Sequence, residues 1–356
     1  MMYTASDRDS YPGGIVDRRT QLVVVIALST ALVAGCTSNG PSGSGEPTTS
    51  STGATSPAAT SAASTTPPAL VTFGDVEESQ VVPKGQTLGY MDAGPQGLVY
   101  VPNSTSGEVL VLNAAGHIAR RWGLTETGKR RLDCWRNPSS RKDDLCGVAI
   151  TEDGTAFVAE SGADRVSRFL TGGERDLTWG TSGTKDGAFQ EPIGVDVGPD
   201  GSVYVVDDVR DDIQVFSADG AYVRTIGAHG TEPGQMNFTG MVRVMDDGSV
   251  VNADFDNARV QAFSPAGKLQ WWFGSYGSGP GEFVEPQDIA FGPGGLLFVM
   301  DAGRVQVFDR SHELVGVWPA DGEWDAHLGS IALVGNTLWV EPSYTGTLLR
   351  VPVSYS

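Results

Sequence analysis

Positive charge is scarce in this sequence. Its 356 residues include 24 Lys or Arg and 43 Asp or Glu, which gives a formal net charge of −19 at pH 7. Only five of the basic residues are lysine. Because recognition of nucleic-acid phosphates requires a positive surface, this composition excludes a nucleic-acid-binding function for the chain as a whole.

Long apolar segments are also lacking. A helix that crosses a membrane needs about 20 apolar residues. The longest apolar run, residues 22–35, has 14 and is too short to span a bilayer. It follows Arg18 and Arg19, and its length is typical of the core of a secretion signal peptide.

The end of this run carries a short motif. Val33-Ala34-Gly35-Cys36 resembles the lipobox of bacterial lipoproteins, in which a signal peptidase cleaves before the cysteine. The resemblance implies that residues 1–35 are a lipoprotein signal peptide and that Cys36 carries lipid. It implies an extracytoplasmic protein anchored to the outer face of a bacterial cell membrane. An ordinary signal peptide is the alternative, and Arg18-Arg19 leaves both the general and the twin-arginine export routes open.

Residues 36–69 have the composition of a linker. Of the 32 residues from 37 to 68, 30 are Ser, Thr, Gly, Pro or Ala, and none is large and apolar. Such a segment cannot bury enough surface to offset its chain entropy, so we expect it to be disordered. As a flexible coil it would hold its ends roughly 30 Å apart.

Residues 70–356 contain an internal repeat. The turn dipeptides Asp153-Gly154, Asp200-Gly201, Asp247-Gly248 and Gly294-Gly295 follow one another at intervals of 47 residues. The same interval separates the acidic residues Glu160, Asp207, Asp254 and Asp301. Two sets of markers in one register indicate a repeat architecture.

Each repeat unit has a β pattern. In the third unit, residues 194–197, 203–206, 213–216 and 222–226 are short runs rich in β-branched and aromatic residues, separated by turn residues. We name the strands expected there a, b, c and d. Four strands in 40–50 residues are typical of a β-propeller blade.

The ends of the repeat region predict how the ring closes. The a–b–c pattern occurs six times, and six d strands end at a bulky residue, the first at Phe73. The region therefore begins with a d strand and ends with a c strand. We expect residues 70–73 to complete the sheet begun by residues 331–353, because closure removes exposed sheet edges.

Here the residues resemble a known family. The strings EPIGVDVGPDGSVYVVDDVRDDIQVF, DFDNARVQAF and GSYGSGPGEFVEP resemble the NHL repeat. The resemblance covers essentially all of residues 70–356 and implies an all-β, six-bladed β-propeller with four-stranded antiparallel blades.

One inserted loop stands out on the face that carries the b–c and d–a loops. The spacing between blades one and two is ten residues longer than elsewhere, and residues 120–146 hold eight Lys or Arg against four acids. Because an exported protein meets an oxidising compartment, we expect Cys134 and Cys146 to form a disulfide. The candidate residues for an anionic ligand are Arg130, Arg131, Trp135 and Arg136. The alternative is a solvated loop whose charges pair with the acidic body of the domain.

Acidic residues at the end of strand b are a second candidate site. The ligand-binding candidates there are Asp207, Asp208, Asp211 and Asp254. Clustered oxygens in the third blade could hold Ca²⁺, although no EF-hand spacing is present. The alternative is that these aspartates cap the b–c turn through backbone hydrogen bonds.

The start of strand a supplies a third candidate, at the mouth of the central channel. Its potential metal ligands are Asp144, Glu191, Glu285, Asp288 and His327. Converging carboxylates could bind a divalent metal, as in propeller lactonases of the gluconolactonase type. Glu before Pro is also an ordinary part of the repeat. Only two of the four histidines fall on this face, too few for a three-histidine zinc site.

These observations favour a binding function over catalysis. We expect a lipid-anchored, monomeric lipoprotein whose propeller binds a protein, a peptide or an anionic envelope glycan on its loop-rich face. The alternative is a metal-dependent lactonase or lyase that acts at the channel mouth. The nucleophile motif G-x-S-x-G is absent from the sequence.

Overall fold

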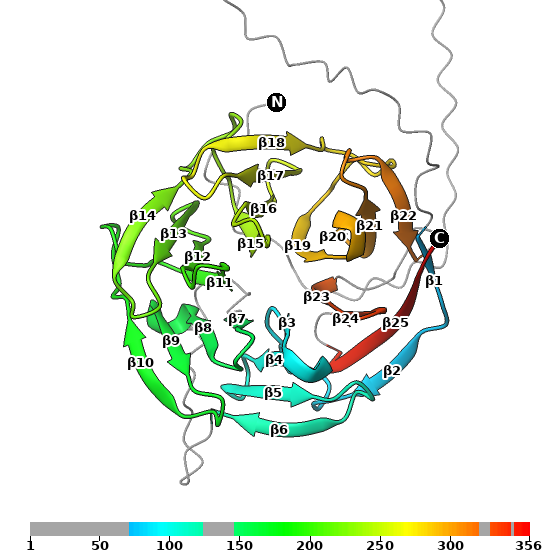
Figure 1. The fold of residues 1–356 in the computed structure, drawn as a ribbon, viewed down its shortest axis with the longest axis horizontal. Helices are drawn as coiled ribbons and strands as arrows, with labels where there is room; N and C mark the ends of the chain where they lie inside the picture. The colour runs from blue at the N-terminus through cyan, green and yellow to red at the C-terminus, as the bar shows by residue number, and fades with distance from the viewer. Residues whose placement is uncertain (1–70, 124–145, 320–327, 343–344) are drawn as a thin grey trace, which may run out of the picture. The chain divides into compact units, whose positions relative to one another are not determined.

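A computed structural model describes residues 71–123, 146–319, 328–342 and 345–356. These residues form six antiparallel sheets arranged as blades around a central axis (Figure 1). The predicted all-β, six-bladed propeller is therefore confirmed. In each blade strand a lies nearest the axis and strand d at the rim.

The first three blades each contain four strands in chain order. Blade one consists of β3 (Asp92–Ala93), β4 (Val99–Asn103), β5 (Glu108–Leu112) and β6 (Ile118–Trp122). Blade two consists of β7 (Cys146–Ile150), β8 (Ala156–Glu160), β9 (Arg165–Phe169) and β10 (Arg175–Trp179). Blade three consists of β11 (Pro192–Val197), β12 (Val203–Asp207), β13 (Asp212–Phe216) and β14 (Tyr222–Ile226).

Blades four and five repeat this order. Blade four consists of β15 (Thr239–Val244), β16 (Val250–Asp254), β17 (Arg259–Phe263) and β18 (Leu269–Phe273). Blade five consists of β19 (Pro286–Phe291), β20 (Leu297–Asp301), β21 (Arg304–Phe308) and β22 (Leu314–Trp318). Short 3₁₀ turns are η1 (Pro95–Gly97), η2 (Ser161–Ala163) and η3 (Pro293–Gly295).

Blade six is built from both ends of the repeat region. It contains β23 (Leu328–Val334), β24 (Thr337–Pro342), β25 (Thr347–Tyr355), β1 (Val71–Phe73) and β2 (Glu77–Gln80). Val71 pairs with Tyr355, which confirms the predicted closure. A second piece, β2, pairs with the first half of β25, from Thr347 to Arg350. The outer strand of this blade is therefore double, which the sequence pattern did not predict.

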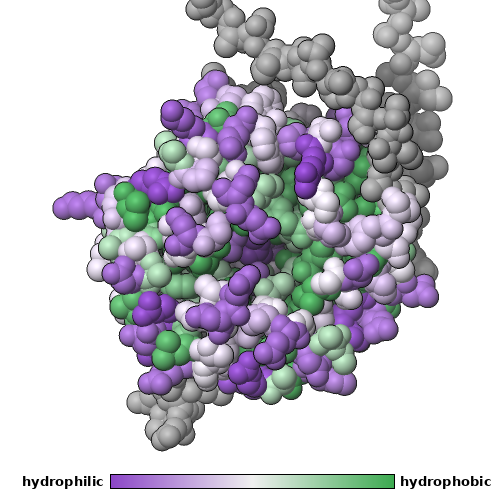
Figure 2. Space-filling view, viewed as in Figure 1, coloured by the Kyte–Doolittle hydropathy of each residue, from purple (hydrophilic) through white to green (hydrophobic). Residues whose placement is uncertain are grey.

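The antiparallel order defines two faces of the ring. The b–c and d–a loops leave one face, here called the loop face. The a–b and c–d turns leave the other, here called the turn face. On the face shown in Figure 2, hydrophilic residues border a hollow at the centre of the ring.

The hydrophobic core lies between neighbouring blades. Tyr204 of β12 packs in one buried cluster with Val242 and Phe263 of blade four. Trp339 of β24 packs in another with Val99 and Leu110 of blade one, across the closing seam. The aromatic residues at this repeat position of strand b are almost fully buried: Tyr100, Phe157, Tyr204, Phe298 and Trp339.

Glycine after strand d is required by close packing. Gly180 has a φ of +100°, and a Cβ atom added there would lie 2.6 Å from the ring of Phe189. Gly274 and Phe283 repeat this arrangement two blades later. Gly274 has a φ of +108°, and its added Cβ would lie 2.5 Å from the Phe283 ring. At these two positions, the glycine that follows the bulky last residue of strand d makes room for an aromatic residue of the following d–a loop.

The proposed signal peptide, Cys36 and the linker lie outside the described residues, so their boundaries stay predictions. Within the described part of the chain, no helix is long and apolar enough to cross a membrane.

Removal of the closing strands should destabilise the ring. A chain that begins at residue 70 should unfold like the full repeat region, whereas one that begins at residue 81 loses β1 and β2. Val71 is buried in the cluster between blades five and six, and the edge of β25 would be exposed. We expect the midpoint of thermal unfolding, measured by circular dichroism, to fall by roughly 5 °C or more. Equal midpoints would contradict this role.

Candidate functional site

The acidic residues that end strand b fix loops. Asp207 is fully buried and accepts hydrogen bonds from the backbone N–H groups of Gln190 and Glu191 at 2.7 and 3.1 Å. It also accepts from those of Val209 and Arg210, at 3.2 and 3.1 Å. Burial raises the pKa of Asp207, and these bonds oppose the rise. One carboxylate thus joins the d–a loop to the b–c loop.

Blade four adds a buried arginine to this arrangement. The Nε atom of Arg259 lies 2.7 Å from Oδ2 of Asp254, and both side chains are buried. Arg259 also donates to the carbonyl groups of Thr231, Glu232 and Gln235 in the preceding d–a loop, each at 2.9 Å. The pair therefore holds an entire loop in place.

The same device recurs in blade five. Arg304 donates to Oδ2 of Asp301 and to the carbonyl of Ser278 in the preceding d–a loop, the latter at 2.7 Å. Asp301 also accepts from the N–H groups of Val284 and Glu285, both at 2.7 Å. The acidic series thus bonds to loop backbone groups and to neighbouring arginines. It does not present these carboxylates to solvent.

The third-blade candidates have partners of their own. Asp212 forms a two-pronged pair with Arg210, with N–O distances of 3.1 and 2.7 Å. Asp211 accepts from the N–H of Phe238 at 2.6 Å and lies 2.7 Å from Nδ1 of His229. Asp208 is buried as well. Among the described residues, no group of three or more His, Cys, Asp or Glu side chains could hold a metal ion, so the calcium prediction gains no support.

The predicted basic-loop site falls within residues 124–145. Arg130, Arg131, Trp135, Arg136 and Cys134 lie outside the described residues. Cys146 opens β7 and is fully buried. The disulfide with Cys134 and the anionic-ligand site therefore stay predictions.

In the central channel, aspartates join neighbouring blades. Asp92 of blade one accepts from the N–H of Ile150 in blade two, at 2.8 Å. Asp196 of blade three accepts from the N–H of Val244 in blade four, at 2.6 Å. Asp288 of blade five does the same with Ile331 of blade six, at 3.0 Å. The innermost strands are therefore linked in three pairs.

Arg243 occupies the position in β15 that Asp92 and Asp196 hold in their blades. Its side chain is almost completely buried. Nε donates to the carbonyl of Ile289 at 3.0 Å, and Nη2 lies 3.1 Å from Oδ1 of Asp288. Nη2 also donates to the carbonyl of Met91, at 2.9 Å. Blade one is opposite blade four, so this guanidinium crosses the axis.

These bonds form a closed circuit through four blades. From Arg243 the circuit passes to Asp288, whose Oδ2 accepts from the hydroxyl of Ser330 at 2.8 Å. The Ser330 oxygen in turn accepts from the N–H of Met91, at 2.9 Å. The Met91 carbonyl returns the circuit to Arg243.

This circuit bears on the predicted metal site. The two oxygens of Asp288 already accept four hydrogen bonds, from Arg243, Ile289 N–H, Ser330 and Ile331 N–H. The guanidinium of Arg243 therefore supplies the positive charge beside Asp288. Because both of its oxygens already accept hydrogen bonds, the Asp288 carboxylate does not fit the role of a metal ligand. Glu191 is buried at the start of β11, and Asp144 and His327 lie outside the described residues.

Burial perturbs the titration of the channel aspartates. Desolvation raises the pKa of Asp196 to about 7; Arg243 opposes the rise and Asp92 adds to it. The pKa values of Asp92 and Asp288 are raised for the same main reason.

Glu341 is a buried carboxyl that the sequence did not single out. It lies in β24 and is 1% exposed, and its Oε1 atom has no hydrogen-bond partner among the described residues. Burial raises its pKa to about 8, so the carboxyl is protonated at neutral pH. Met300 holds the corresponding place in blade five. A charged residue at an apolar repeat position was the available signal.

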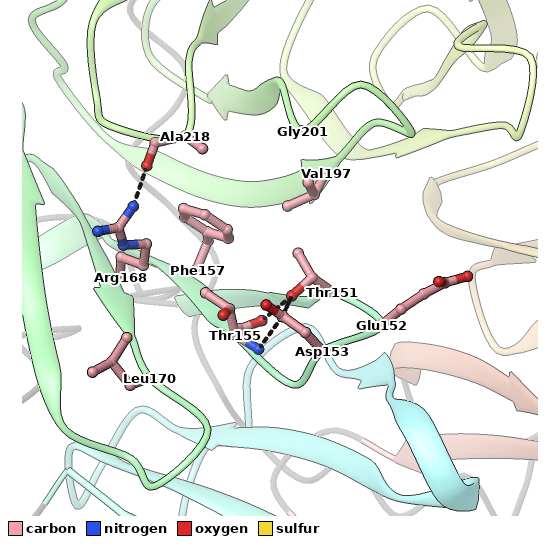
Figure 3. Close-up of a pocket in the computed structure, with 10 residues that line it drawn as sticks. All are labelled: Thr151, Glu152, Asp153, Thr155, Phe157, Arg168, Leu170, Val197, Gly201 and Ala218. Atoms are coloured by element: carbon pink, nitrogen blue, oxygen red, sulfur yellow. Dashed lines mark hydrogen bonds between the residues drawn. The ribbon is translucent and has the colours of Figure 1, made fainter.

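Two cavities lie on the turn face, between blades. One cavity of about 450 Å³ lies between blades two and three, and Asp153, Arg168 and Ala218 are among the residues that line it (Figure 3). Another cavity, of about 640 Å³, lies between blades four and five. The sites predicted from the sequence lie on the loop face, so neither cavity was predicted.

The fold is that of a six-bladed β-propeller. Its blades are antiparallel, its closing strand is double, and its core clusters lie between blades. Neither a protein-family model nor a curated protein sequence matches the chain.

Solved propellers with different names share this fold. Virginiamycin B lyase from Staphylococcus aureus aligns with a TM-score of 0.55 and 14% identity, over 79% of this chain and 99% of that one. A gluconolactonase from Xanthomonas campestris aligns with a TM-score of 0.57 and 14% identity, over 82% and 96%. The WD40 repeats of RRP9 align with a TM-score of 0.53 and 11% identity, over 79% and 98%. These similarities establish the fold and leave the activity open.

Breaking the axial circuit should be costly. Arg243→Met leaves Asp288 buried without its cation, and we expect a loss of roughly 3–5 kcal/mol of unfolding free energy in urea. Adding Asp288→Asn should recover part of this loss, because the unpaired charge is removed. The control Arg121→Met breaks a pair whose arginine is 45% exposed and should cost about 1 kcal/mol or less. A similarly small cost for Arg243→Met would contradict the circuit's role.

The raised pKa of Asp196 predicts a pH dependence. Its folded-state value of about 7 lies above the ordinary 3.8, so the folded chain binds more protons between these limits. The contribution of this group is therefore fully present below pH 3.8 and is lost as the pH rises through 7. Asp196→Asn should flatten the decline of the urea midpoint between pH 5 and 8. The exposed control Glu152→Gln should leave the decline unchanged, and parallel curves for Asp196→Asn would refute the assignment.

Proposed function

We propose that this chain is a lipid-anchored extracytoplasmic binding protein with an NHL-type propeller. Its loop face would bind a protein, a peptide or an anionic envelope glycan. The observation that carries this proposal is the use of buried carboxylates and arginines to hold the d–a loops rigidly.

Rigid loops favour recognition, because less conformational entropy is lost when a ligand binds. Arg259 and Arg304 fix two adjacent d–a loops through several carbonyl groups. These loops expose side chains that can contact a ligand. Tyr276 is 79% exposed, and Val209 of a nearby b–c loop is 42% exposed.

A metal-dependent lactonase or lyase is less well supported. Names of that kind occur among the structural neighbours, but at 13–14% identity. The channel carboxylate Asp288 is saturated by hydrogen bonds and an arginine. Asp92 and Asp196, two further carboxylates near the axis, bind backbone N–H groups of the next blade.

Lipid attachment can be tested at Cys36. In a bacterial host that processes lipoproteins, the full chain should incorporate labelled palmitate and sediment with membranes. Cys36→Ser should abolish both, since the acceptor thiol is removed. Cys134→Ser is the matched control and should keep the label. Labelling of Cys36→Ser would contradict the anchor.

The loop-face ligand can be tested through the basic loop. Reversing Arg130, Arg131 and Arg136 to Glu should weaken capture of partners from a solubilised envelope by roughly tenfold, or about 1.4 kcal/mol. The control is Lys268→Glu, an exposed lysine in a c–d turn of the turn face, away from the proposed binding surface. Thermal unfolding should be unchanged in both. Equal capture by the two variants would exclude this loop as the binding surface.

A further inference from the structure

On the turn face, arginines bridge neighbouring blades at equivalent places. Each donates to the carbonyl of the second residue in the c–d turn of the next blade. Arg168 donates to Ala218 at 2.8 Å, between blades two and three (Figure 3). Arg224 donates to Pro265, between blades three and four.

Two further seams contain the same bond. Arg120 donates to the carbonyl of Thr171 at 3.4 Å, between blades one and two. Arg350 donates to that of Ala114 at 3.0 Å, between blades six and one. Three of these guanidinium groups also lie over an aromatic ring. The ring pairs are Arg120 with Trp122 at 5.8 Å, Arg224 with Tyr204 at 6.0 Å and Arg350 with Trp339 at 5.8 Å.

The seam between blades four and five has no such arginine. Trp271 occupies the strand-d place of Arg120 and Arg224, and Ala262 occupies the strand-c place of Arg168. The carbonyl that would be bridged belongs to Arg310, and no backbone N–H of the described residues donates to it. This seam contains the 640 Å³ cavity.

The c–d turn of blade five differs from its counterparts as well. The fourth turn position is glycine in the first four blades and His312 here, with a φ of +63°. The His312 ring lies 4.4 Å from that of Trp271 and stacks on Phe273 at 4.7 Å, with 14° between the planes. Burial lowers the pKa of His312, which favours the neutral imidazole, and Asp309 opposes this shift. The strained backbone at His312 thus places its ring against the Trp271 side chain, which lines the cavity.

The remaining lining of the cavity is apolar at depth and acidic at the rim. Leu297 is buried, and Met245 and Phe291 are partly buried. Asp246, Asp247 and Asp309 line the same cavity, against one basic residue, Arg310. Asp247 and Asp309 each use one oxygen within a turn, whereas Asp246 is exposed and has no hydrogen bond within the described chain. The rim therefore favours a cation.

We propose that this cavity binds the arginine side chain of a peptide segment. The guanidinium would take the place that the chain's own arginines occupy at four other seams, against an indole face, the Arg310 carbonyl and acidic side chains. The alkyl part would lie on the apolar floor. The proposal concerns the turn face and stands apart from the loop-face function.

The probe is Nα-acetyl-L-arginine amide, titrated into the full chain while Trp fluorescence and heat of binding are followed. The citrulline analogue has nearly the same shape without the charge and should bind at least tenfold more weakly. Trp271→Arg supplies the missing bridge from within and should abolish binding. Leu177→Arg, at the equivalent strand position of blade two, is the matched control and should bind like the parent.

Asp246→Asn provides an independent test, since this side chain is exposed and supports no other group. It should weaken binding of the arginine probe at least threefold and leave thermal unfolding unchanged. Equal affinity for the arginine and citrulline probes would overturn the proposal. So would unchanged binding by Asp246→Asn and by a folded Trp271→Arg.

Discussion

A buried guanidinium at the axis adds polar bonds between blades that are not neighbours in the ring. The hydrophobic clusters lie mainly between neighbouring blades, whereas the bonds of Arg243 extend to the opposite blade. Arg243 bonds to blade five and, across the axis, to blade one, and Asp288 and Ser330 complete the circuit. A charge so deeply buried is tolerated because its carboxylate partner and two carbonyl groups compensate for lost hydration.

Polar residues near both faces of the ring also join separate segments, at positions farther from the axis. Carboxylates at the ends of strand b join loops, and arginines on the turn face join turns. Among the described residues, the strand-b carboxylates and Asp288 are therefore engaged in bonds that hold the scaffold together. What distinguishes a site in such a molecule is a departure from the repeat, as at Trp271 and His312, where the repeated bond is missing.

The fold was largely predictable because its signals are local and periodic. Turn residues at intervals of 47 and a bulky residue before glycine specify strands and blade number, and a d strand at the start specifies closure. The axial circuit was not predictable from the sequence. Nothing in the sequence of β15 shows that Arg243 bonds to Met91, 152 residues away. The proposed arginine site on the turn face was missed for a related reason. The absence of an arginine from two strand positions becomes visible only when the bonds at the other seams are known.

Closure by β1 and β2 also determines how the domain would respond to force. Val71 is at the rim, on the outermost strand of blade six, so tension from any preceding segment enters the ring there rather than at either face (Figure 1). β1 is joined to β25 by only three residue pairs and β2 by four. Under load these few pairs, together with the packing of Val71 between blades five and six, would bear the tension first. The strand that completes the ring is thus also its mechanical release point.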